Sequence, residues 1–567
     1  MKYHKAFIAL LAITFVILGV TSMLRKSPTC DEAAHHIASG YVHLKKADFA
    51  FSPESPPLAR HIMSAPLVFL NLQMPDDRNF WAREDRSKFS REFLYGINRS
   101  QASRIFLMAR LPILMVGLFG GCFLFFWIRK HYDSLSAVVA TFLYFLSPNI
   151  LAHSRFATTD IVATVFIMCS IFSFWDYLIK PGKKQIFIAG AFLGLALMSK
   201  FTALALVPVY CLIILSLVVR KYISGEKRES YVLLSSFFGV VFISIIVLWS
   251  GYFFEYKPFL EGALRAEWKE AFFINLITKV YPDVGMRFLD NCRRMLYETP
   301  VLLSSYLMGI LGIIRHGIEG STMFFVGKWG IKGHPLYFLV AFFIKTPIPV
   351  IFSFLFGLFV ILKKKHKTYI NLYLLCFVLL FFVLASRSNL QLGLRYVLPA
   401  YPLIFLIGAV GVRELLLGKY FYKGLAVISL IWMMVIHVFI WPDYLSYFNE
   451  FIGGPSNGYK YLRDSNIDWG QDLPALKEYM ESKAIDEIFL SYFGTADPAF
   501  YDINYTEIFP EDTDALGGKV CAVSVQYLEN FEWTKVVKPT HVIGYSIFIY
   551  DFRNQDRIMN VPAEDKL

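Results

Sequence analysis

Two adjacent carboxylates, Asp31 and Glu32, come directly after the first long apolar run, residues 6–24. A carboxylate in a partly desolvated setting can act as a general base that takes a proton from a hydroxyl group. His35 and His36 follow the pair at helical spacing. An acidic pair at a helix start can also cap the helix and complement its dipole, so a structural role stays open for Asp31.

Further ionisable residues stand at the edges of later apolar runs, where charge is costly and often marks a site or a pathway. They are Glu54, Arg60 and His61 in FSPESPPLARHI; His153, Arg155 and Asp160 in LSPNILAHSRFATTD; His334 and Lys345 in GHPLYFLVAFFIKTP; and Arg387 and Arg395 in ASRSNLQLGLRYVLPAYP. Arginine and lysine near an interface suit a phosphate or pyrophosphate group. Arg387 and Arg395 could instead snorkel, whereas Lys345 lies inside an apolar stretch and needs an anion or a carbonyl partner.

Carboxylates beside basic groups suit the transfer of a group from a lipid phosphate to a hydroxyl acceptor. The sequence has no Walker loop and no GxGxxG nucleotide fingerprint, which disfavours a nucleotide-sugar donor. The residues His35, His36, Glu54 and His61 could in principle bind a metal, but their spacing matches no tight zinc motif. No cofactor is predicted, and the requirement for a divalent metal stays open.

The composition predicts the elements that carry these residues. The chain has 567 residues, of which 56% are hydrophobic and 18% are charged; a soluble domain is about a quarter charged. A membrane-spanning helix needs about 20 mostly apolar residues. Eleven runs qualify, namely 6–24, 102–128, 134–150, 160–179, 185–198, 202–219, 231–251, 336–362, 369–385, 397–412 and 424–441. A twelfth, 301–314, has 14 residues and favours an interfacial helix.

The basic residues predict the orientation of these spans. The short loops on one side hold sixteen lysines and arginines, and those on the other side hold four. The positive-inside rule then predicts a cytoplasmic N-terminus and an exterior C-terminus. The net charge of +12 fits loop anchoring and not nucleic-acid binding, because the basic residues lie between apolar runs. Seven cysteines without a CxxC pair argue against a zinc finger or a thiol redox motif.

Three long segments are then exterior, namely the loops 25–101 and 252–335 and the tail 442–567. The tail carries strand-like runs near 487–493 and 519–525 and an amphipathic helix at 473–483. We therefore expect a multispanning domain, 1–441, and a small soluble α/β domain, 442–567. In the tail, four residues suit polar or carbohydrate contacts to an acceptor, although the block could instead dock the tail onto the membrane domain: Asp464, Asp468, Trp469 and Gln471.

At these residues the sequence resembles the multispanning GT-C glycosyltransferases that use polyprenyl-phosphate sugars. Within them it is similar to glycosyltransferase family 39, the group of protein O-mannosyltransferases and aminoarabinose transferases, and to its bacterial relatives. The matching pieces are the Asp31-Glu32 pair, PESPPL at 53–58, SRFATTD ending in Asp160, GLALMSKFTAL at 194–204, FFIKTP at 342–347, LRYVLPAYP at 394–402, the block 448–479 and SYFGTADP at 491–498. The likeness covers nearly the whole chain.

The resemblance implies an inverting sugar transferase of the bacterial plasma membrane, with Asp31 as the base and Asp160 assisting near the substrates. By position, Lys345 and Arg395 would hold the donor phosphate. Glu54 aligns with the acidic position before PPL in the aminoarabinose transferases, but Ser55 replaces the lysine found beside it there. The implied partners are a polyprenyl-phosphate-linked sugar, a hydroxyl-bearing acceptor of the cell envelope and membrane lipids, without nucleic acid.

Two other functions fit a multispanning chain. A flippase or transporter for a lipid-linked sugar should carry charges in mid-span and show repeat symmetry; the charges here lie mostly at the faces of the spans, and no repeat is evident. A non-catalytic envelope scaffold would not need Asp31, Asp160 and Lys345 on one side of the membrane.

Overall fold

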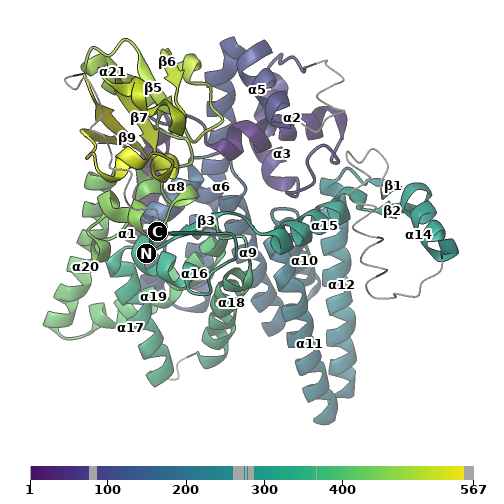
Figure 1. The fold of residues 1–567 in the computed structure, drawn as a ribbon. Helices are drawn as coiled ribbons and strands as arrows, with labels where there is room; N and C mark the ends of the chain where they lie inside the picture. Colours follow the sequence, from purple (N-terminus) through teal and green to yellow (C-terminus); the bar gives the residue numbers. More distant parts are fainter. Residues whose placement is uncertain are drawn as a thin grey trace. The chain divides into compact units, whose positions relative to one another are not determined.

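The computed structural model describes residues 2–75, 86–259, 274, 278, 286–364 and 367–553. The described chain is mostly helical, with a small mixed sheet near the C-terminus (Figure 1). It divides into two compact units, each of which is discontinuous in sequence. Unit 1 comprises Met1–Ala34, Leu94–Ala157 and Glu319–Leu567, and unit 2 comprises His35–Phe93 and Thr158–Ile318.

Among the described residues, eight helices are long and apolar enough to cross a membrane. These spans correspond to α1 (Lys2–Met23), α6 (Ala102–His131), α9 (Asp160–Ile179), α11 (Leu206–Ile223), α12 (Lys227–Gly251), α18 (Thr368–Arg387), α19 (Tyr401–Leu417) and α20 (Tyr420–Ile440). Three of them include the 3₁₀ helix that precedes the α-helix, and they run over Arg99–His131, Phe201–Ile223 and Leu394–Leu417. This set confirms the predicted polytopic helical fold. The number is smaller than the eleven expected runs because one helix is short and two runs are broken.

The two broken runs correct the expectation of continuous helices at 134–150 and 336–362. The first consists of α7 (Ser134–Phe145) and α8 (Pro148–Ser154), bent by 59°, and the second of α16 (Tyr337–Lys345) and α17 (Ile348–Lys364), bent by 114°. A proline follows each break, and a proline drives the preceding residue out of the helical conformation. Thr346 before Pro347 is accordingly extended, with φ −97° and ψ 135°. Counting each bent pair as one span gives ten.

In unit 1, α17 packs closely along α19, and α1 packs against α6 and α7. Glycines allow the closest approach between α17 and α19. A Cβ atom on Gly357 would lie 2.0 Å from the carbonyl oxygen of Ile407, and one on Gly411 would lie 2.6 Å from the Gly357 nitrogen. Small residues at such crossings let helix backbones meet inside a bilayer.

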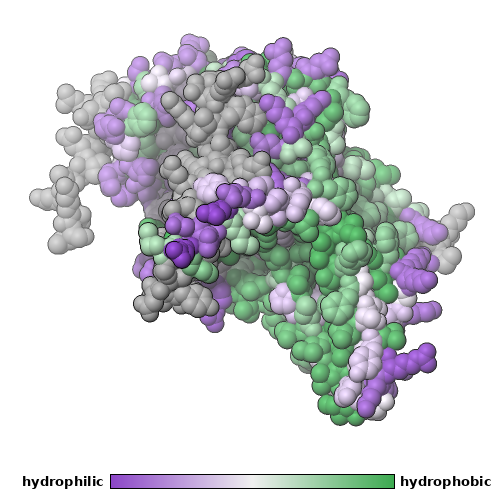
Figure 2. All heavy atoms as spheres, turned by 90° about the vertical axis from the view of Figure 1, so that its right-hand side faces the viewer, coloured by the Kyte–Doolittle hydropathy of each residue, from purple (hydrophilic) through white to green (hydrophobic). Residues whose placement is uncertain are grey.

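In unit 2, α9 and α12 pack against α10 (Lys183–Leu197), and α11 packs against α12. The 15 residues of α10 fall short of a full span. Exposed apolar side chains on α11 and α12, such as Leu212, Phe238 and Phe242, suit contact with lipid, and Figure 2 shows a broad hydrophobic surface on the face that it presents. The remaining elements are α2 (Ile37–Lys46), α3 (Leu58–Ser64), α5 (Arg86–Arg91), β1 (Tyr256–Pro258), α14 (Met286–Glu298), β2 (Pro300–Leu302) and α15 (Ser304–Glu319).

The C-terminal part of unit 1 contains a five-stranded sheet in the order β6-β5-β7-β9-β8. Its strands are β5 (Ile488–Ser491), β6 (Tyr505–Glu507), β7 (Val520–Ser524), β8 (His541–Ile543) and β9 (Ile547–Asp551). Strand β5 pairs parallel to β6 and β7, and β9 pairs antiparallel to β7 and β8. With α21 (Leu473–Ser482), these elements confirm the helix and both strands predicted for the tail. A separate hairpin joins β3 (Met323–Phe325) and β4 (Lys328–Gly330).

Candidate active site

The Asp31 carboxylate forms an ion pair with Arg395 in unit 1. Arg395 lies in a 3₁₀ helix, Leu394–Ala400 (η6), just before α19, and its Nη1 donates to Asp31 Oδ2 at 2.7 Å. The side chains keep 24% and 10% of their surface exposed, so a molecule from outside can reach the pair. The Arg395 guanidinium also lies 4.3 Å from the centre of the Trp469 ring. The structure thus brings together a carboxylate, a cation and an aromatic face from three distant parts of the chain.

Glu32, the second acid of the pair, points into the protein and is fully buried. Its carboxylate accepts two hydrogen bonds from Arg110 on α6, at 2.7 and 2.9 Å, and one from the Ala157 amide at 2.7 Å. Arg110 also donates to the carbonyl oxygens of Lys26 and Ser27. Such a bidentate pair has a fixed geometry. Glu32 therefore anchors the segment after α1, and this contact accounts for its burial.

The tail block 464–472 packs directly on the segment 26–31. The Ser27 amide donates to the Gln471 carbonyl oxygen at 3.0 Å, and the Cys30 amide donates to the Trp469 carbonyl oxygen at 2.9 Å. Between them, Gly470 has φ +83°, and a Cβ atom there would lie 2.8 Å from the Gly494 Cα atom, so glycine fits this turn. The tail block and the N-terminal segment belong to the same compact unit, and the domain boundary at 441 stays a prediction.

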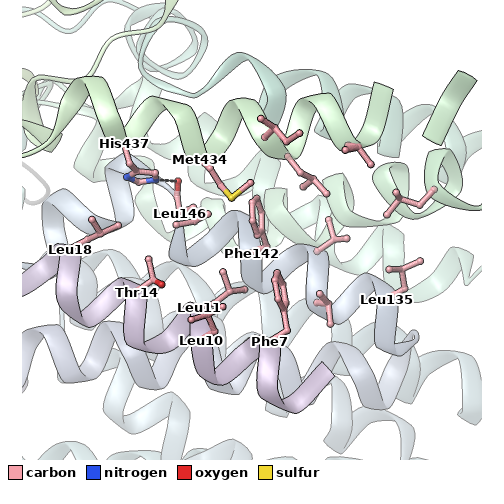
Figure 3. Close-up of a pocket in the computed structure, with 16 residues that line it drawn as sticks. Phe7, Leu10, Leu11, Thr14, Leu18, Leu135, Phe142, Leu146, Met434 and His437 are labelled. Atoms are coloured by element: carbon pink, nitrogen blue, oxygen red, sulfur yellow. Dashed lines mark hydrogen bonds between the residues drawn. The ribbon is translucent and has the colours of Figure 1, made fainter. Parts of the chain in front are cut away.

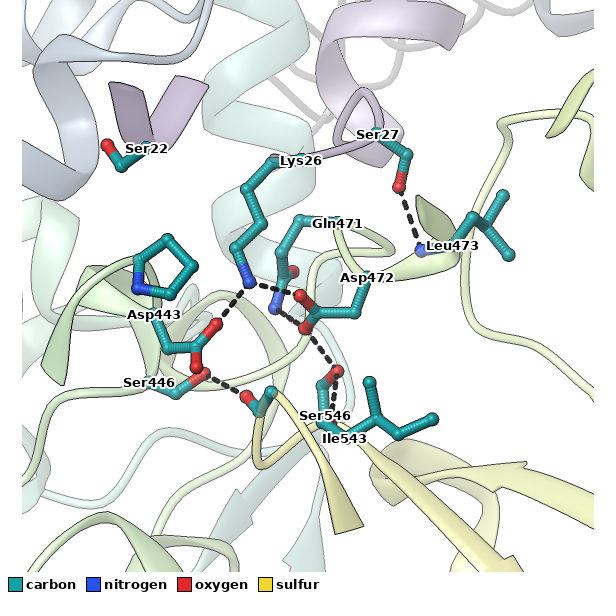
Figure 4. A network of polar contacts seen from close by, with 12 residues as sticks. Ser22, Lys26, Ser27, Asp443, Ser446, Gln471, Asp472, Leu473, Ile543 and Ser546 are labelled. Carbon is teal, nitrogen blue, oxygen red and sulfur yellow. Dashed lines mark hydrogen bonds and ion pairs between the residues drawn. The ribbon is translucent and has the colours of Figure 1, made fainter. Parts of the chain in front are cut away.

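A buried ion network reinforces this docking (Figure 4). The Lys26 ammonium, whose side chain is 2% exposed, pairs with both Asp443 and Asp472. Asp472 also accepts hydrogen bonds from Gln471 Nε2 at 2.8 Å and from Ser546 Oγ at 2.5 Å. A buried charge is tolerated when its partners and hydrogen bonds are complete. The network therefore fixes the path of the chain on its way to Asp31.

Two more carboxylates of the tail block are buried, and one of them, Asp464, interacts electrostatically with Asp31 and Arg395. Burial raises the pKa of Asp464 to about 6, with Arg395 opposing the rise and the Asp31 charge adding to it. Burial also raises the pKa of Asp468 well above its usual range, although Asp468 Oδ1 accepts a hydrogen bond from the Gly470 amide at 3.0 Å. Asp468, Trp469 and Gln471 are all at most 2% exposed. Of the four predicted acceptor residues, only Asp464 is part-exposed.

Lys345 ends α16 beside the break in its span, and its ammonium lies in a cage of backbone carbonyls. It donates to the carbonyl oxygens of Leu445 at 2.9 Å, Tyr447 at 3.1 Å and Asn466. An ammonium has three donors, and three carbonyls use them. Lys345 therefore has the geometry of a structural clamp, and its assignment to the donor phosphate stays a prediction.

The other predicted residues of unit 1 lie in different settings. His153 is buried with its ring 6.1 Å from the Trp469 ring. Arg155 is fully buried and donates to the Pro442 carbonyl oxygen. His334 stacks on Phe325, with 4.5 Å between the ring centres, and Arg387 is exposed at the end of α18. Only His153 is in contact with a residue of the Asp31–Arg395–Trp469 cluster through these interactions.

The predicted residues of unit 2 form contacts of their own. Asp160 begins α9, is 2% exposed and accepts a hydrogen bond from Lys200 Nζ at 2.6 Å. Burial acts to raise the pKa of Glu54, but the Arg86 guanidinium paired with it holds that pKa below its usual value.

Beside Glu54, Arg60 donates to the Ser52 carbonyl oxygen, and the His61 ring stacks on Phe253. Burial and the nearby Arg60 charge lower the pKa of His61 to about 4. Arg60 and His61 thus have structural contacts within unit 2, and their assignment to substrate binding stays a prediction.

Sequence reasoning missed Arg110 and Lys200 as partners of the predicted acids Glu32 and Asp160. It also missed Lys26 as the partner of Asp443 and Asp472. A signal was present for Arg110, because it is an arginine inside the apolar run 102–128 and such a charge calls for a buried partner. The sequence pattern marks Lys26 and Lys200 only as loop charges between apolar runs. In the described part of the chain, no group of three His, Cys, Asp or Glu side chains is placed to hold a metal ion.

Comparison with known proteins finds a family model that matches part of the chain. Residues 91–257 match the family model described as dolichyl-phosphate-mannose-protein mannosyltransferase. The matched stretch contains Arg110, Asp160 and Lys200. No curated protein matches the chain.

Solved structures give a distant likeness. The apo crystal structure of ArnT from Cupriavidus metallidurans is 12% identical, with a TM-score of 0.47 over 96% of this chain and 97% of that one. The structure of the same protein bound to undecaprenyl phosphate is 11% identical, with a TM-score of 0.46 over 96% of this chain and 98% of that one. The apo crystal structure of the oligosaccharyltransferase of Archaeoglobus fulgidus is 14% identical, with a TM-score of 0.45 over 89% of this chain and 64% of that one.

The assignment rests on the family match over residues 91–257 and on the spanning helices. The family match confirms the resemblance expected from the sequence motifs. The spanning helices that a membrane enzyme needs are present among the described residues. The chain is an integral membrane glycosyltransferase, and its residues 91–257 are similar to the family described as dolichyl-phosphate-mannose-protein mannosyltransferase.

Proposed function

We propose that this protein transfers a sugar from a polyprenyl-phosphate donor to a hydroxyl group of a cell-envelope acceptor at the outer face of the membrane, with inversion at the anomeric carbon. The observation that carries the proposal is the Asp31–Arg395 pair. It supplies a base and an anion-binding group in one place, within a chain that has a mannosyltransferase family match. These are the two groups that such a reaction requires.

The reaction begins with an exchange of partners at Arg395. The donor phosphate binds the guanidinium and competes with the Asp31 carboxylate for it. Asp31 loses its stabilising cation, and this raises its proton affinity. The base therefore becomes stronger when the donor is in place.

Transfer then occurs by a single displacement. The acceptor hydroxyl gives its proton to Asp31 while its oxygen bonds to the anomeric carbon. The bond between that carbon and the phosphate oxygen breaks, and its electron pair leaves with the polyprenyl phosphate. Arg395 stabilises the negative charge of the leaving phosphate. Asp160, held by Lys200, is the second candidate acid for positioning a substrate.

The membrane orientation is part of the proposal. The basic loops support a cytoplasmic N-terminus and an exterior tail. Reporter fusions at residues 182 and 224 should then report the cytoplasm, and a fusion after the last residue should report the exterior. A cytoplasmic C-terminus would remove the proposed acceptor side.

The function can be tested with purified protein in bilayers. A panel of radiolabelled polyprenyl-phosphate sugars is incubated with cell-envelope extract, using wild-type protein and the variant Asp31→Asn. We expect one labelled donor to be consumed, with label transferred to an extract component by wild type and not by the variant. Absence of transfer from every donor, or equal transfer by the variant, would contradict the proposal.

A further inference from the structure

An apolar groove runs along four helices of unit 1 (Figure 3). Its volume is about 580 Å³, and its lining comes from α1, α7, the end of α19 and α20. Fourteen of its sixteen lining residues are hydrocarbon or thioether side chains, and the other two are Thr14 and His437. Since α1, α19 and α20 are candidate spans, the groove lies at membrane depth.

The groove offers little to a water molecule. His437, at one end, already uses both ring nitrogens: Nε2 lies 3.0 Å from the Leu146 carbonyl oxygen, and Nδ1 lies 3.3 Å from the Tyr444 hydroxyl. A buried water needs two to four polar partners, and the groove lining does not supply them. A hydrocarbon chain is the occupant that fits such a surface inside a bilayer.

The opposite end of the groove is basic. Lys423 precedes the lining residue Val427 by one helical turn on α20, and Lys419 follows the lining residue Leu416 by three residues. Both lysines are exposed, and no ion pair involves either of them within the described residues. Asp133 and Glu414, each two residues before a lining residue, are paired with other cations: Asp133 with Arg413 at 2.8 Å, and Glu414 with Arg413 at 2.9 Å and with Lys364. A net positive charge therefore remains at this end.

We propose that the groove binds an acyl chain of an anionic phospholipid, whose phosphate is held by Lys419 and Lys423. Positively charged residues at the cytoplasmic end of a span attract anionic headgroups. The predicted orientation places both lysines on the cytoplasmic side. The groove is thus a lipid site separate from the proposed donor site.

The distance along α20 argues against the donor as occupant. From Lys423 to the end of α20 is 17 residues, about 26 Å at the rise of an α-helix. A phosphate on Lys419 and Lys423 would lie at one end of this helix. Asp443, which belongs to the Lys26 network that precedes Asp31, follows its other end.

The test is native mass spectrometry of the purified full-length protein with dioleoyl phosphatidylglycerol or dioleoyl phosphatidylcholine. Val427→Trp places an indole in the groove and should abolish the tightest phosphatidylglycerol adduct. Val438→Trp is the matched control, because Val438 is on the same helix, is 77% exposed and does not line the groove. Its binding should equal that of wild type.

The headgroup is tested separately, with the groove lining unchanged. The double variant Lys419→Gln/Lys423→Gln should weaken phosphatidylglycerol binding by about 30-fold, since each lysine near an anionic headgroup contributes about fivefold. Phosphatidylcholine binding should not change. The control is Lys183→Gln/Lys184→Gln, which removes two exposed lysines at the start of α10, predicted on the same membrane side.

Three results would overturn the proposal. The first is phosphatidylglycerol binding that is unchanged in both Val427→Trp and the Lys419/Lys423 double variant. The second is displacement of phosphatidylglycerol by undecaprenyl phosphate one for one, which would make the groove part of the donor site. The third is a protein dimer that Val427→Trp dissociates, which would make the groove an interface between two copies. If Val427→Trp does not fold, phosphatidylglycerol binding by the Lys419→Gln/Lys423→Gln variant alone tests the proposal.

Discussion

Arg395 donates its hydrogen bond to Asp31 across 364 residues of sequence, and the same guanidinium lies over the ring of Trp469. The pair therefore connects the segment after the first span, the segment before α19 and the tail. Because one cation serves the carboxylate at rest and the donor phosphate in the proposed reaction, binding of the donor and activation of the base are the same event.

Loss of the Arg395 charge should weaken donor binding. We expect Arg395→Gln to raise KM for the polyprenyl-phosphate donor by about 10- to 100-fold, as for the loss of a charge-assisted hydrogen bond. Arg395→Lys should keep part of the donor affinity, since an ammonium group keeps the charge but lacks the planar fork of a guanidinium. Initial-rate kinetics measure both. An effect of equal size in Arg104→Gln, at an exposed arginine of α6, would show a general charge effect instead.

Asp31→Asn should reduce kcat by about 10²- to 10⁴-fold, the usual contribution of a general base. Donor binding should persist or tighten, because Arg395 is then released from its pair. Single-turnover rates and donor titration together measure the two effects. If the variant keeps most of the wild-type rate, Asp31 serves only as the partner of Arg395, and Asp160→Asn becomes the variant to examine.

Glu32→Gln should act on stability. Removing one partner of a buried ion pair typically costs about 3–5 kcal/mol, so we expect a lower Tm in detergent. The matched control is Glu478→Gln, because Glu478 pairs with Arg25 at the surface, where both side chains are more than half exposed, and such pairs contribute about 0–1 kcal/mol. Equal Tm values for the two variants would contradict the anchoring role of Glu32.

The Lys345 cage makes a related prediction. Lys345→Met introduces a side chain of similar length but leaves three backbone carbonyls without their hydrogen-bond donor, so the Tm should fall. Donor KM should stay unchanged if the cage is the whole role of this lysine. A rise in donor KM with little change in Tm would instead restore Lys345 to the phosphate site.

The raised pKa of Asp464 predicts a pH effect. Asp464 is protonated below about pH 6 and ionised above it. When ionised, it adds a negative charge near Asp31 and makes Asp31 a stronger base, so kcat/KM should rise as the pH increases through about 6. Asp464→Asn should move this acid limb to lower pH. An unchanged profile would exclude Asp464 from the electrostatics of the site.

The sequence predicted the apolar elements well because their signal is local. Runs of apolar residues anticipate α1, α9 and α12 within a few residues, and short alternating runs anticipate β5 and β7. The breaks at Ser147 and Thr346 also had a local signal, the prolines that follow them, but hydropathy averages over such positions. A window that reads 336–362 as one apolar run does not register a bend of 114°.

The division of roles within the acidic pair could not be predicted from the sequence. Asp31 and Glu32 are neighbours with similar side chains, and only their partners, Arg395 and Arg110, separate a part-exposed carboxylate from a buried one. Those partners are 364 and 78 residues away. Likewise, nothing in the DSNIDWGQDL block indicates that Trp469 would contact Cys30, because that contact depends on the tertiary path of both segments.

The Lys26 network has a consequence for how the protein is made. Its carboxylate partners, Asp443 and Asp472, lie 417 and 446 residues after the lysine. During synthesis, the Lys26 ammonium therefore has neither carboxylate partner until almost the whole chain, including the last span, has been made. A chain that ends before residue 443 would leave the Lys26 ammonium without these two carboxylates. It would also lack the tail block that docks on the segment carrying Asp31.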